Sequence, residues 1–197
     1  MIHILDVPCG DMVWMSRFLQ TRQDIYYTGI DIVPDLISHH KQTYGRFQRW
    51  RFLEADILDH NFIIDDYDLI INRMMLQHLY FNDVLKLLKK FSDSGSQFLL
   101  LTTFPAHPKN EELIIDPHEN PGRFRYLNLE IPPIALTPPE CLQRDGPIDA
   151  FEGWAHFVGL WKLPLRRIKY CDEDQTFMYK IPYSPVKVHT CTRVEIL

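Results

Sequence analysis

Polar side chains follow four apolar runs in the first part of the chain, each near the point where the run ends. The first run ends at Asp6 and leads into a turn around Gly10, and later runs end at or just before Asp31, Asp56 and Asn72. A carboxylate offers two acceptor oxygens, so Asp31 could accept from both hydroxyls of a ribose, and Asp56 could accept from an adenine amino group. Gly10 lets the backbone approach a ligand closely. This pattern predicts a nucleotide-type ligand across the ends of parallel strands.

These runs alternate with helical patterns, which is the order expected of a mostly parallel sheet in an α/β protein. Taken singly, each strand-end carboxylate is better explained by a turn or a helix cap, but their joint spacing favours a ligand. Helices are expected near residues 14–19, from Pro34 onward and over 82–91. Strands are expected at 2–6, 25–31, around Phe52 and Leu53, at 68–72, 98–103 and 158–163, and more weakly at 176–181.

Length and charge narrow the class of protein. The 197 residues suit one domain, 1–197, with a single apolar core. The formal net charge of −5 argues against nucleic acid as a partner, because phosphate contacts need an excess of Lys and Arg. No apolar run approaches the roughly 18 residues of a membrane span, and the first residues do not resemble a cleavable signal. We therefore expect a cytoplasmic protein without a membrane partner.

The cysteines are spread through the chain without the spacing of a metal site or a disulfide framework. They are Cys9, Cys141, Cys171 and Cys191. We expect no metal and a reducing compartment.

Residues 105–147 are rich in proline and have few periodic runs. Such a long irregular segment in a compact domain is usually functional or disordered, and its large apolar side chains argue against disorder. We expect an ordered, irregular cover over the carboxyl ends of the strands, on the substrate side. Arg125 and Asn128 in this cover are candidate substrate-binding residues, with packing of the cover as the equal alternative.

Four stretches resemble the successive motifs of class I S-adenosylmethionine-dependent methyltransferases: Asp6–Gly10, Gly29–Asp31, Ala55–Ile57 and Asp68–Asn72. The resemblance covers residues 2–103 and implies a Rossmann-like fold with S-adenosyl-L-methionine as cofactor. Further stretches resemble a little-characterised, largely bacterial subgroup with an Asp-x-Pro-Cys-Gly-Asp first motif, and extend the similarity to residue 163. They are Asp6–Asp11 with Trp14 and Met15, Asn72 and Arg73 with Gln77–Leu79, Arg125–Leu129, and Gly159–Leu163.

The resemblance implies a role for each matching position. Asp31 would bind the ribose, and Asp56 and Ile57 would face the adenine. Ile32, next to Asp31, is a further cofactor-binding candidate. Asn72 and Arg73 would flank the methionine end, and the methionine part would be surrounded by Asp6, Pro8, Cys9, Gly10, Asp11 and Trp14. The first motif departs from the family's glycine-rich loop, since Pro8 and Met12 stand where the family has its first and third glycines. These proteins usually carry a segment before the first strand, so a missing N-terminal segment is expected.

Methyl transfer from a sulfonium is an in-line displacement, so the protein has to align the nucleophile and, where necessary, accept its proton. His78 is the candidate general base because imidazole exchanges protons near neutral pH; a histidine that caps the following helix is the even alternative. Arg73 could orient an anionic substrate or hold the cofactor's carboxylate, with a surface salt bridge as its alternative. Three other histidines are expected at the surface: His39, His40 and His107.

The function predicted is methyl transfer from S-adenosylmethionine to an oxygen or nitrogen of a small-molecule acceptor, such as a sugar or another metabolite. A degenerate regulatory domain that binds the cofactor without turnover is the first alternative. A nicotinamide-dependent oxidoreductase is the second, and it fits poorly because Met12 replaces the second glycine of the Gly-x-Gly-x-x-Gly fingerprint. The oligomeric state is left open.

Overall fold

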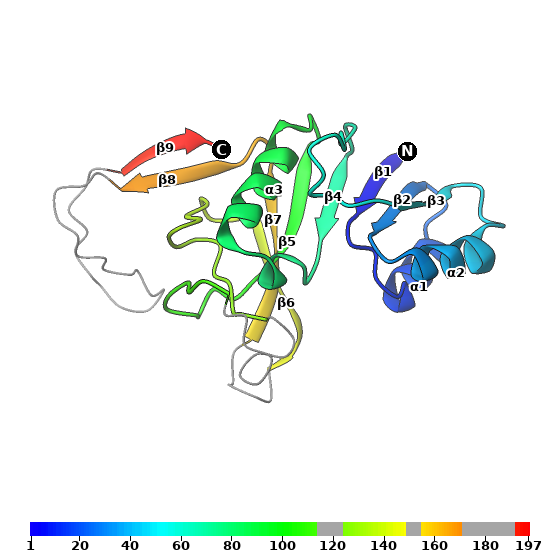
Figure 1. Ribbon diagram of the computed structural model, residues 1–197, viewed down its shortest axis with the longest axis horizontal. Coiled ribbons are helices and arrows are strands. Elements are labelled where there is room, and N and C mark those ends of the chain that lie inside the picture. Colours follow the sequence, from blue (N-terminus) through cyan, green and yellow to red (C-terminus); the bar gives the residue numbers. More distant parts are fainter. Residues whose placement is uncertain (114–123, 149–154, 171–191) are drawn as a thin grey trace.

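The computed structural model describes residues 1–113, 124–148, 155–170 and 192–197 (Figure 1). The helices are α1 (Val13–Gln20), α2 (Pro34–Tyr44) and α3 (Phe81–Asp93), with a short 3-10 helix, η1 (Leu76–His78), before α3. The strands are β1 (Ile2–Asp6), β2 (Ile25–Asp31), β3 (Trp50–Glu54), β4 (Leu69–Asn72), β5 (Phe98–Thr103), β6 (Cys141–Ile148), β7 (Ala155–Lys162), β8 (Arg166–Tyr170) and β9 (Thr192–Ile196).

Within the described residues, seven strands form one sheet in the order β3-β2-β1-β4-β5-β7-β6, and β8 pairs with β9 separately. Strands β1 to β5 pair in parallel, whereas β7 runs antiparallel to both β5 and β6. Strand β6 therefore points the same way as β1 to β5. The first residues of β7 lie at the edge where the other strands have their carboxyl ends. The predicted α/β fold with a mostly parallel sheet is confirmed.

Two apolar cores form because successive side chains of a strand point to opposite faces. Ile4 of β1 packs in one core with residues of α1, α2, β2 and β3, among them Met15, Leu19, Ile37 and Phe52. Leu5 packs in the other core with β4, β5 and the apolar face of α3, which consists of Val84, Leu87, Leu88 and Phe91. Figure 1 shows α1 and α2 near β2 and β3, and α3 near β4 and β5. None of the helices described is long and apolar enough to cross a membrane.

The strongly periodic elements have the predicted positions. The strands predicted at 25–31 and 98–103 have these bounds in the structure, and Pro34 begins α2. The third strand begins earlier than predicted, at Trp50, and the strand predicted at 158–163 is β7. The strand predicted at 176–181 lies outside the described residues.

The prediction that residues 105–147 are irregular is wrong for the last part of that segment, which forms β6. Its sequence, Cys-Leu-Gln-Arg-Asp-Gly-Pro-Ile, lacks an apolar alternation because β6 is an edge strand of the sheet. A register shift between Arg144 and Ile148 interrupts its pairing with β7. Edge strands tolerate the proline that a central strand excludes.

Residues 124–140 follow an irregular path beside the carboxyl end of β5 and are firmly packed. The Leu129 N–H donates to Thr103 Oγ1 at 3.1 Å, and the Phe104 N–H donates to the Leu127 carbonyl at 3.0 Å. Four apolar side chains of this segment are fully buried: Leu127, Leu129, Ile134 and Leu136. The segment is therefore part of the core next to the strand ends.

The buried side chain of Asn128 holds this segment to the chain that leaves β5. Its Nδ2 donates to the carbonyls of Pro105 and His107 at 3.0 and 3.1 Å, and its Oδ1 accepts the Glu130 N–H at 3.0 Å. These contacts favour the packing alternative for Asn128.

Replacing Asn128 by alanine is expected to lower the free energy of unfolding by about 2–4 kcal/mol, because three hydrogen bonds are lost at a buried position. Urea denaturation followed by tryptophan fluorescence measures the change. Asn61→Ala, in an exposed turn, is the control and should stay within about 0.5 kcal/mol of wild type. An Asn128→Ala variant as stable as wild type would contradict the packing role and favour the substrate side.

Candidate functional site

The turn between β1 and α1 begins directly after Asp6, at the carboxyl edge of the sheet. Gly10 has a φ of +55° and Met12 a φ of +61°, both in the left-handed region that glycine favours. The Cys9 N–H donates to the carbonyl of Ile30, near the end of β2, at 2.8 Å. The turn thus passes between the ends of neighbouring strands, and Met12 adopts the conformation that a glycine would adopt.

Asp31, the last residue of β2, faces this turn. Its Oδ2 accepts the Gly10 N–H and its Oδ1 accepts the Val33 N–H, both at 3.1 Å. Only 6% of the residue is exposed. A carboxylate has about four lone-pair sites, so two remain after these bonds. Two free acceptor sites match the two hydroxyls of a ribose.

Asn72, the last residue of β4, contacts the same turn from the other side. Its Nδ2 donates to the Val7 carbonyl at 2.6 Å. Its Oδ1 is buried and has no hydrogen-bond partner within the described part of the chain. A buried amide oxygen without a donor costs free energy, so a donor group of a ligand would stabilise this position.

Asp6 supports the turn from inside the protein. It is buried, and its Oδ2 accepts the Tyr27 hydroxyl at 2.8 Å. Burial raises the pKa of the Asp6 carboxyl from 3.8 to about 7, although the Tyr27 hydrogen bond and the charge of Arg73 oppose this shift. Burial also raises the pKa of the Cys9 thiol to about 12, so the thiol stays neutral. A contact of either residue with the cofactor stays a prediction.

The expectation that His40 lies at the surface is wrong. His40 is buried on α2, and its Nε2 lies 2.7 Å from the Gly10 carbonyl oxygen. Its ring also packs against Phe52, with 5.2 Å between the ring centroids. Helical spacing could have found it, since Ile37 and His40 lie three residues apart on the buried face of α2. His39 is exposed and His107 is half-buried.

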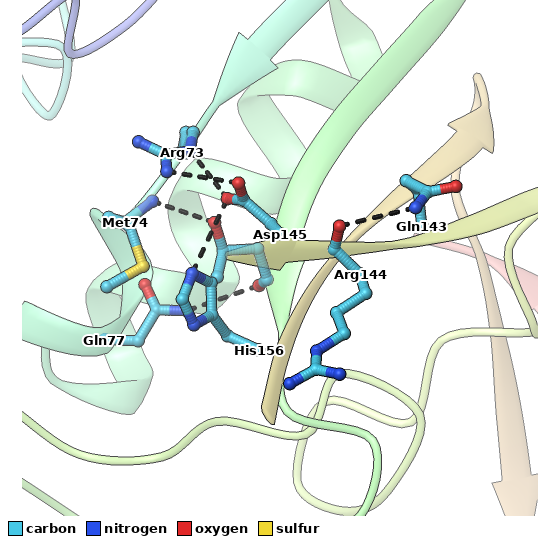
Figure 2. A network of polar contacts seen from close by, with 8 residues as sticks. Arg73, Met74, Gln77, Gln143, Arg144, Asp145 and His156 are labelled. Carbon is cyan, nitrogen blue, oxygen red and sulfur yellow. Dashed lines mark hydrogen bonds and ion pairs between the residues drawn. The ribbon is translucent and has the colours of Figure 1, made fainter. Parts of the chain in front are cut away.

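Arg73, which follows β4, forms a two-pronged ion pair with Asp145 of β6 (Figure 2). Its Nε donates to Oδ2 at 2.7 Å and its Nη2 to Oδ1 at 3.2 Å. Asp145 Oδ2 also lies 3.8 Å from Nε2 of His156, on β7. Sequence analysis singled out Arg73 but missed Asp145 and His156, because the Arg73 contact spans 72 residues and reaches a strand that was not predicted.

The other residues predicted to bind the cofactor lie near the same edge with different exposure. Ile57 is buried and Pro8 is half-buried, whereas the exposed ones are Asp11, Trp14, Ile32 and Asp56. Asp56 Oδ1 accepts the Leu58 N–H at 2.8 Å and Asp11 Oδ1 accepts the Val13 N–H at 3.0 Å. These are the hydrogen bonds of a turn and of a helix start, so both carboxylates have a local structural role. Their contact with the cofactor stays a prediction.

The predicted base His78 and the predicted substrate-binding residue Arg125 differ in exposure. His78 is exposed on η1, with its ring 5.6 Å from that of Phe124. Arg125 is buried and donates to Glu112 at 2.8 Å and to the Leu79 carbonyl at 2.5 Å. These contacts favour packing of the cover as the role of Arg125. The role of His78 as a base stays a prediction.

Two surface hollows, of about 350 and 500 Å³, lie away from this site. The first is lined by His3, Asp68 and Gly95, and the second by Ile25, Arg49 and Trp50. These residues stand at or near the amino ends of strands. The hollows therefore belong to the opposite edge of the sheet.

Known proteins resemble this chain in sequence and in fold. Residues 4–94 match the family model described as "Methyltransferase domain". Over residues 4–94 the chain is thus similar to a methyltransferase domain. This match agrees with the family predicted from the sequence. Two of the solved structures with a similar fold contain S-adenosylhomocysteine, which agrees with S-adenosylmethionine as the predicted cofactor.

Solved structures show the same fold over most of this chain. The 1,6-didemethyltoxoflavin-N1-methyltransferase of Burkholderia thailandensis is 16% identical, with 82% of this chain and 71% of that chain covered and a TM-score of 0.59. The N-methyltransferase NodS of Bradyrhizobium japonicum is 15% identical, with 83% and 78% covered and a TM-score of 0.59. The methyltransferase domain of bacterial CtHen1-C is 17% identical, with 82% and 89% covered and a TM-score of 0.59.

Other relatives are longer than this chain. The chain spans 22% of the length of PKMT2 from Rickettsia typhi and 30% of that of coclaurine N-methyltransferase, at 19% and 20% identity over 53% and 51% of this chain. Their TM-scores of 0.47 and 0.45 are too low to carry an argument. No curated protein sequence matches the chain.

The buried Asp6 makes the stability of the domain depend on pH in a defined direction. Its carboxyl pKa is about 7 in the folded chain against 3.8 without burial, so folding takes up a proton between these values. Its contribution to the free energy of unfolding is fully present below pH 3.8. That contribution falls by up to about 1.4 kcal/mol per pH unit as the pH rises toward 7.

Asp6→Asn is expected to remove this dependence, so the Tm of wild type relative to that of the variant should fall from pH 5 to pH 8. Thermal unfolding followed by circular dichroism at several pH values measures it. Asp35→Asn, at an exposed position on α2, is the control and should leave the wild-type pH profile in place. Parallel profiles for wild type and Asp6→Asn would contradict the assignment.

Proposed function

We propose that the chain transfers the methyl group of S-adenosylmethionine to an oxygen or nitrogen of a small-molecule acceptor, such as a sugar or another metabolite. The observation that carries this proposal is the pair of acceptors on the two sides of the Gly10 turn. Asp31 keeps two acceptor sites and Asn72 keeps an unpaired buried oxygen. These groups suit the ribose hydroxyls and the amino group of the cofactor.

The chemical demand on the protein is modest, because the cofactor supplies a methyl group already activated by a positively charged sulfur. The residues of the chain have to bind the cofactor, align the acceptor and take its proton where the acceptor requires it. Arg73 follows Asn72 at the end of β4, and we propose that its guanidinium binds the carboxylate of the methionine part.

A small-molecule acceptor is supported by charge and by two relatives. One relative was solved with bound 1,6-didemethyltoxoflavin, which its name identifies as the compound it methylates at N1, and another is an N-methyltransferase. The formal net charge of −5 opposes a long phosphate-rich acceptor. The exposed side chains of Trp14 and Ile32 add apolar surface beside the turn.

We also propose a cytoplasmic location. Cys9 and Cys141, the cysteines in the described part of the chain, are both free thiols. Free thiols are typical of a reducing compartment.

Calorimetric titration with S-adenosylhomocysteine, with NAD as the control ligand, tests the cofactor assignment without knowledge of the acceptor. Saturable binding of S-adenosylhomocysteine alone is expected. Binding of NAD alone would contradict the proposal and favour a nicotinamide-dependent oxidoreductase. Binding of S-adenosylhomocysteine without methyl transfer to any of a panel of amines and alcohols would favour the regulatory alternative.

Replacing Asp31 by alanine is expected to weaken the binding of S-adenosylhomocysteine at least about 100-fold, because two hydrogen bonds to a charged group, each worth about 1.5–3 kcal/mol, are lost. Calorimetry measures the affinity, and thermal unfolding checks that the variant is folded. Asp35→Ala is the matched control and should bind as wild type does. Undiminished binding by a folded Asp31→Ala variant would show that the ribose lies elsewhere.

A further inference from the structure

A carboxylate and an imidazole that sequence analysis did not assign meet at the carboxyl edge of the sheet. Asp145 Oδ2 lies 3.8 Å from His156 Nε2, and the two side chains are 22% and 19% exposed. Figure 2 shows both beside the guanidinium of Arg73. Both side chains are thus mostly buried, but about a fifth of each stays accessible to solvent.

The direction of β7 places this pair at the proposed site. Because β7 runs antiparallel, its residue Phe157 pairs with Thr103, the last residue of β5, and with Arg144 of β6. His156, one residue before, therefore lies at the edge where β4 and β5 end. Its ring centroid is 5.8 Å from that of Phe104, which directly follows β5.

A local irregularity in β6 sets the direction of Asp145. The register of β6 against β7 shifts between Arg144 and Ile148, and Gly146 within this stretch has a φ of +92°. Such bulges re-aim side chains and are common next to active sites. A Cβ on Gly146 would lie 3.3 Å from Cε1 and 3.4 Å from Nε2 of His156. The absence of a side chain at Gly146 therefore lets the ring lie close to the backbone of β6.

The carboxylate beside the ring is itself fixed. Arg73 holds both Asp145 oxygens, so the carboxylate cannot rotate away from His156 without breaking a two-pronged ion pair. Among the described residues, His156 has an ion-pair contact with Asp145, which in turn pairs with Arg73. Asp145 is at ion-pair distance from the imidazole, so its charge would stabilise the imidazolium that forms when the histidine takes a proton.

We propose that His156 is the general base of the methyl transfer and that Asp145 is its positioning residue; this inference rests on the proposed function. With the Nε2–H directed at Asp145, Nδ1 carries the lone pair. As the bond from the methyl carbon to the acceptor nitrogen or oxygen forms, the carbon–sulfur bond breaks and its electron pair stays on sulfur, giving S-adenosylhomocysteine. The acceptor's proton moves to Nδ1, the Asp145 carboxylate stabilises the imidazolium, and the proton then leaves to solvent.

Sinefungin and S-adenosylhomocysteine together test this placement without an acceptor. Sinefungin carries an amino group where the cofactor carries its methyl group, and S-adenosylhomocysteine has nothing there. The histidine Cε1–H signals are followed by NMR over a pH titration of each complex, with His156→Asn used to assign the signal. Sinefungin is expected to lower the titration midpoint of His156 by at least about half a pH unit relative to S-adenosylhomocysteine, because a nearby ammonium disfavours imidazolium.

Each other outcome decides against the inference. Equal midpoints for His156 in the two complexes would overturn it, and a selective change at His78 would assign the base there. If neither compound binds, the proposed function itself fails and the inference fails with it.

Two variants separate a chemical role from a structural one. Asp145→Asn is expected to lower the titration midpoint of His156 because the neighbouring negative charge is lost, whereas Asp93→Asn, in an exposed ion pair with Lys89, should not change it.

The kinetic test uses an amine or alcohol acceptor found by a screen with radiolabelled cofactor. With this acceptor, His156→Asn is expected to lower kcat about 100- to 10,000-fold. Its affinity for S-adenosylhomocysteine should stay within about twofold of wild type, and His39→Asn should change neither value. Wild-type kcat in His156→Asn would refute the inference.

Discussion

The candidate site depends on the parallel pairing of β1 with a strand on each side. The register sets Asp6 opposite Gly29 of β2 and opposite Ile71 of β4. Strand β2 therefore extends two residues further, to Asp31, and β4 one residue further, to Asn72. The chain that leaves β1 has to pass between these two longer strands. This stagger places a carboxylate and an amide on the two sides of one turn.

Side chains, rather than a run of glycines, hold that turn. The N–H of Gly10 is bound by Asp31 and its carbonyl by His40, while Asn72 binds the carbonyl of Val7. Backbone polar groups removed from water need such partners, and here the partners come from β2, α2 and β4. The turn and the Asp31 carboxylate are therefore fixed before any ligand arrives, which reduces the ordering that binding would require.

The sequence predicts best what depends on local pattern. The predicted bounds of two strands, 25–31 and 98–103, agree with the structure to the residue, because these apolar runs are bounded by polar residues or turns. Asp31 follows from the first of these runs and Asn72 from the run predicted at 68–72, since a residue at a strand end is located as soon as the strand is. His40 could have been found from its helical spacing with Ile37, whereas β6 has the composition of an edge strand and produced no recognisable signal. The contact of Arg73 with Asp145 depends on sheet order and on a bulge, which no spacing in the sequence encodes.

Arg73 lies between the proposed cofactor site at the Gly10 turn and the pair formed by Asp145 and His156. A guanidinium has five N–H donors in one plane, and the bonds to Asp145 use two of them. Within the described residues three donors remain, so Arg73 could bind the carboxylate of the cofactor, as proposed, without releasing Asp145. Because the guanidinium is rigid, a carboxylate bound on its other side would also fix the position of Asp145 and, through it, of His156. The cofactor end and the proposed base would then be held relative to each other by one planar group, although they contact strands that lie far apart in the sequence.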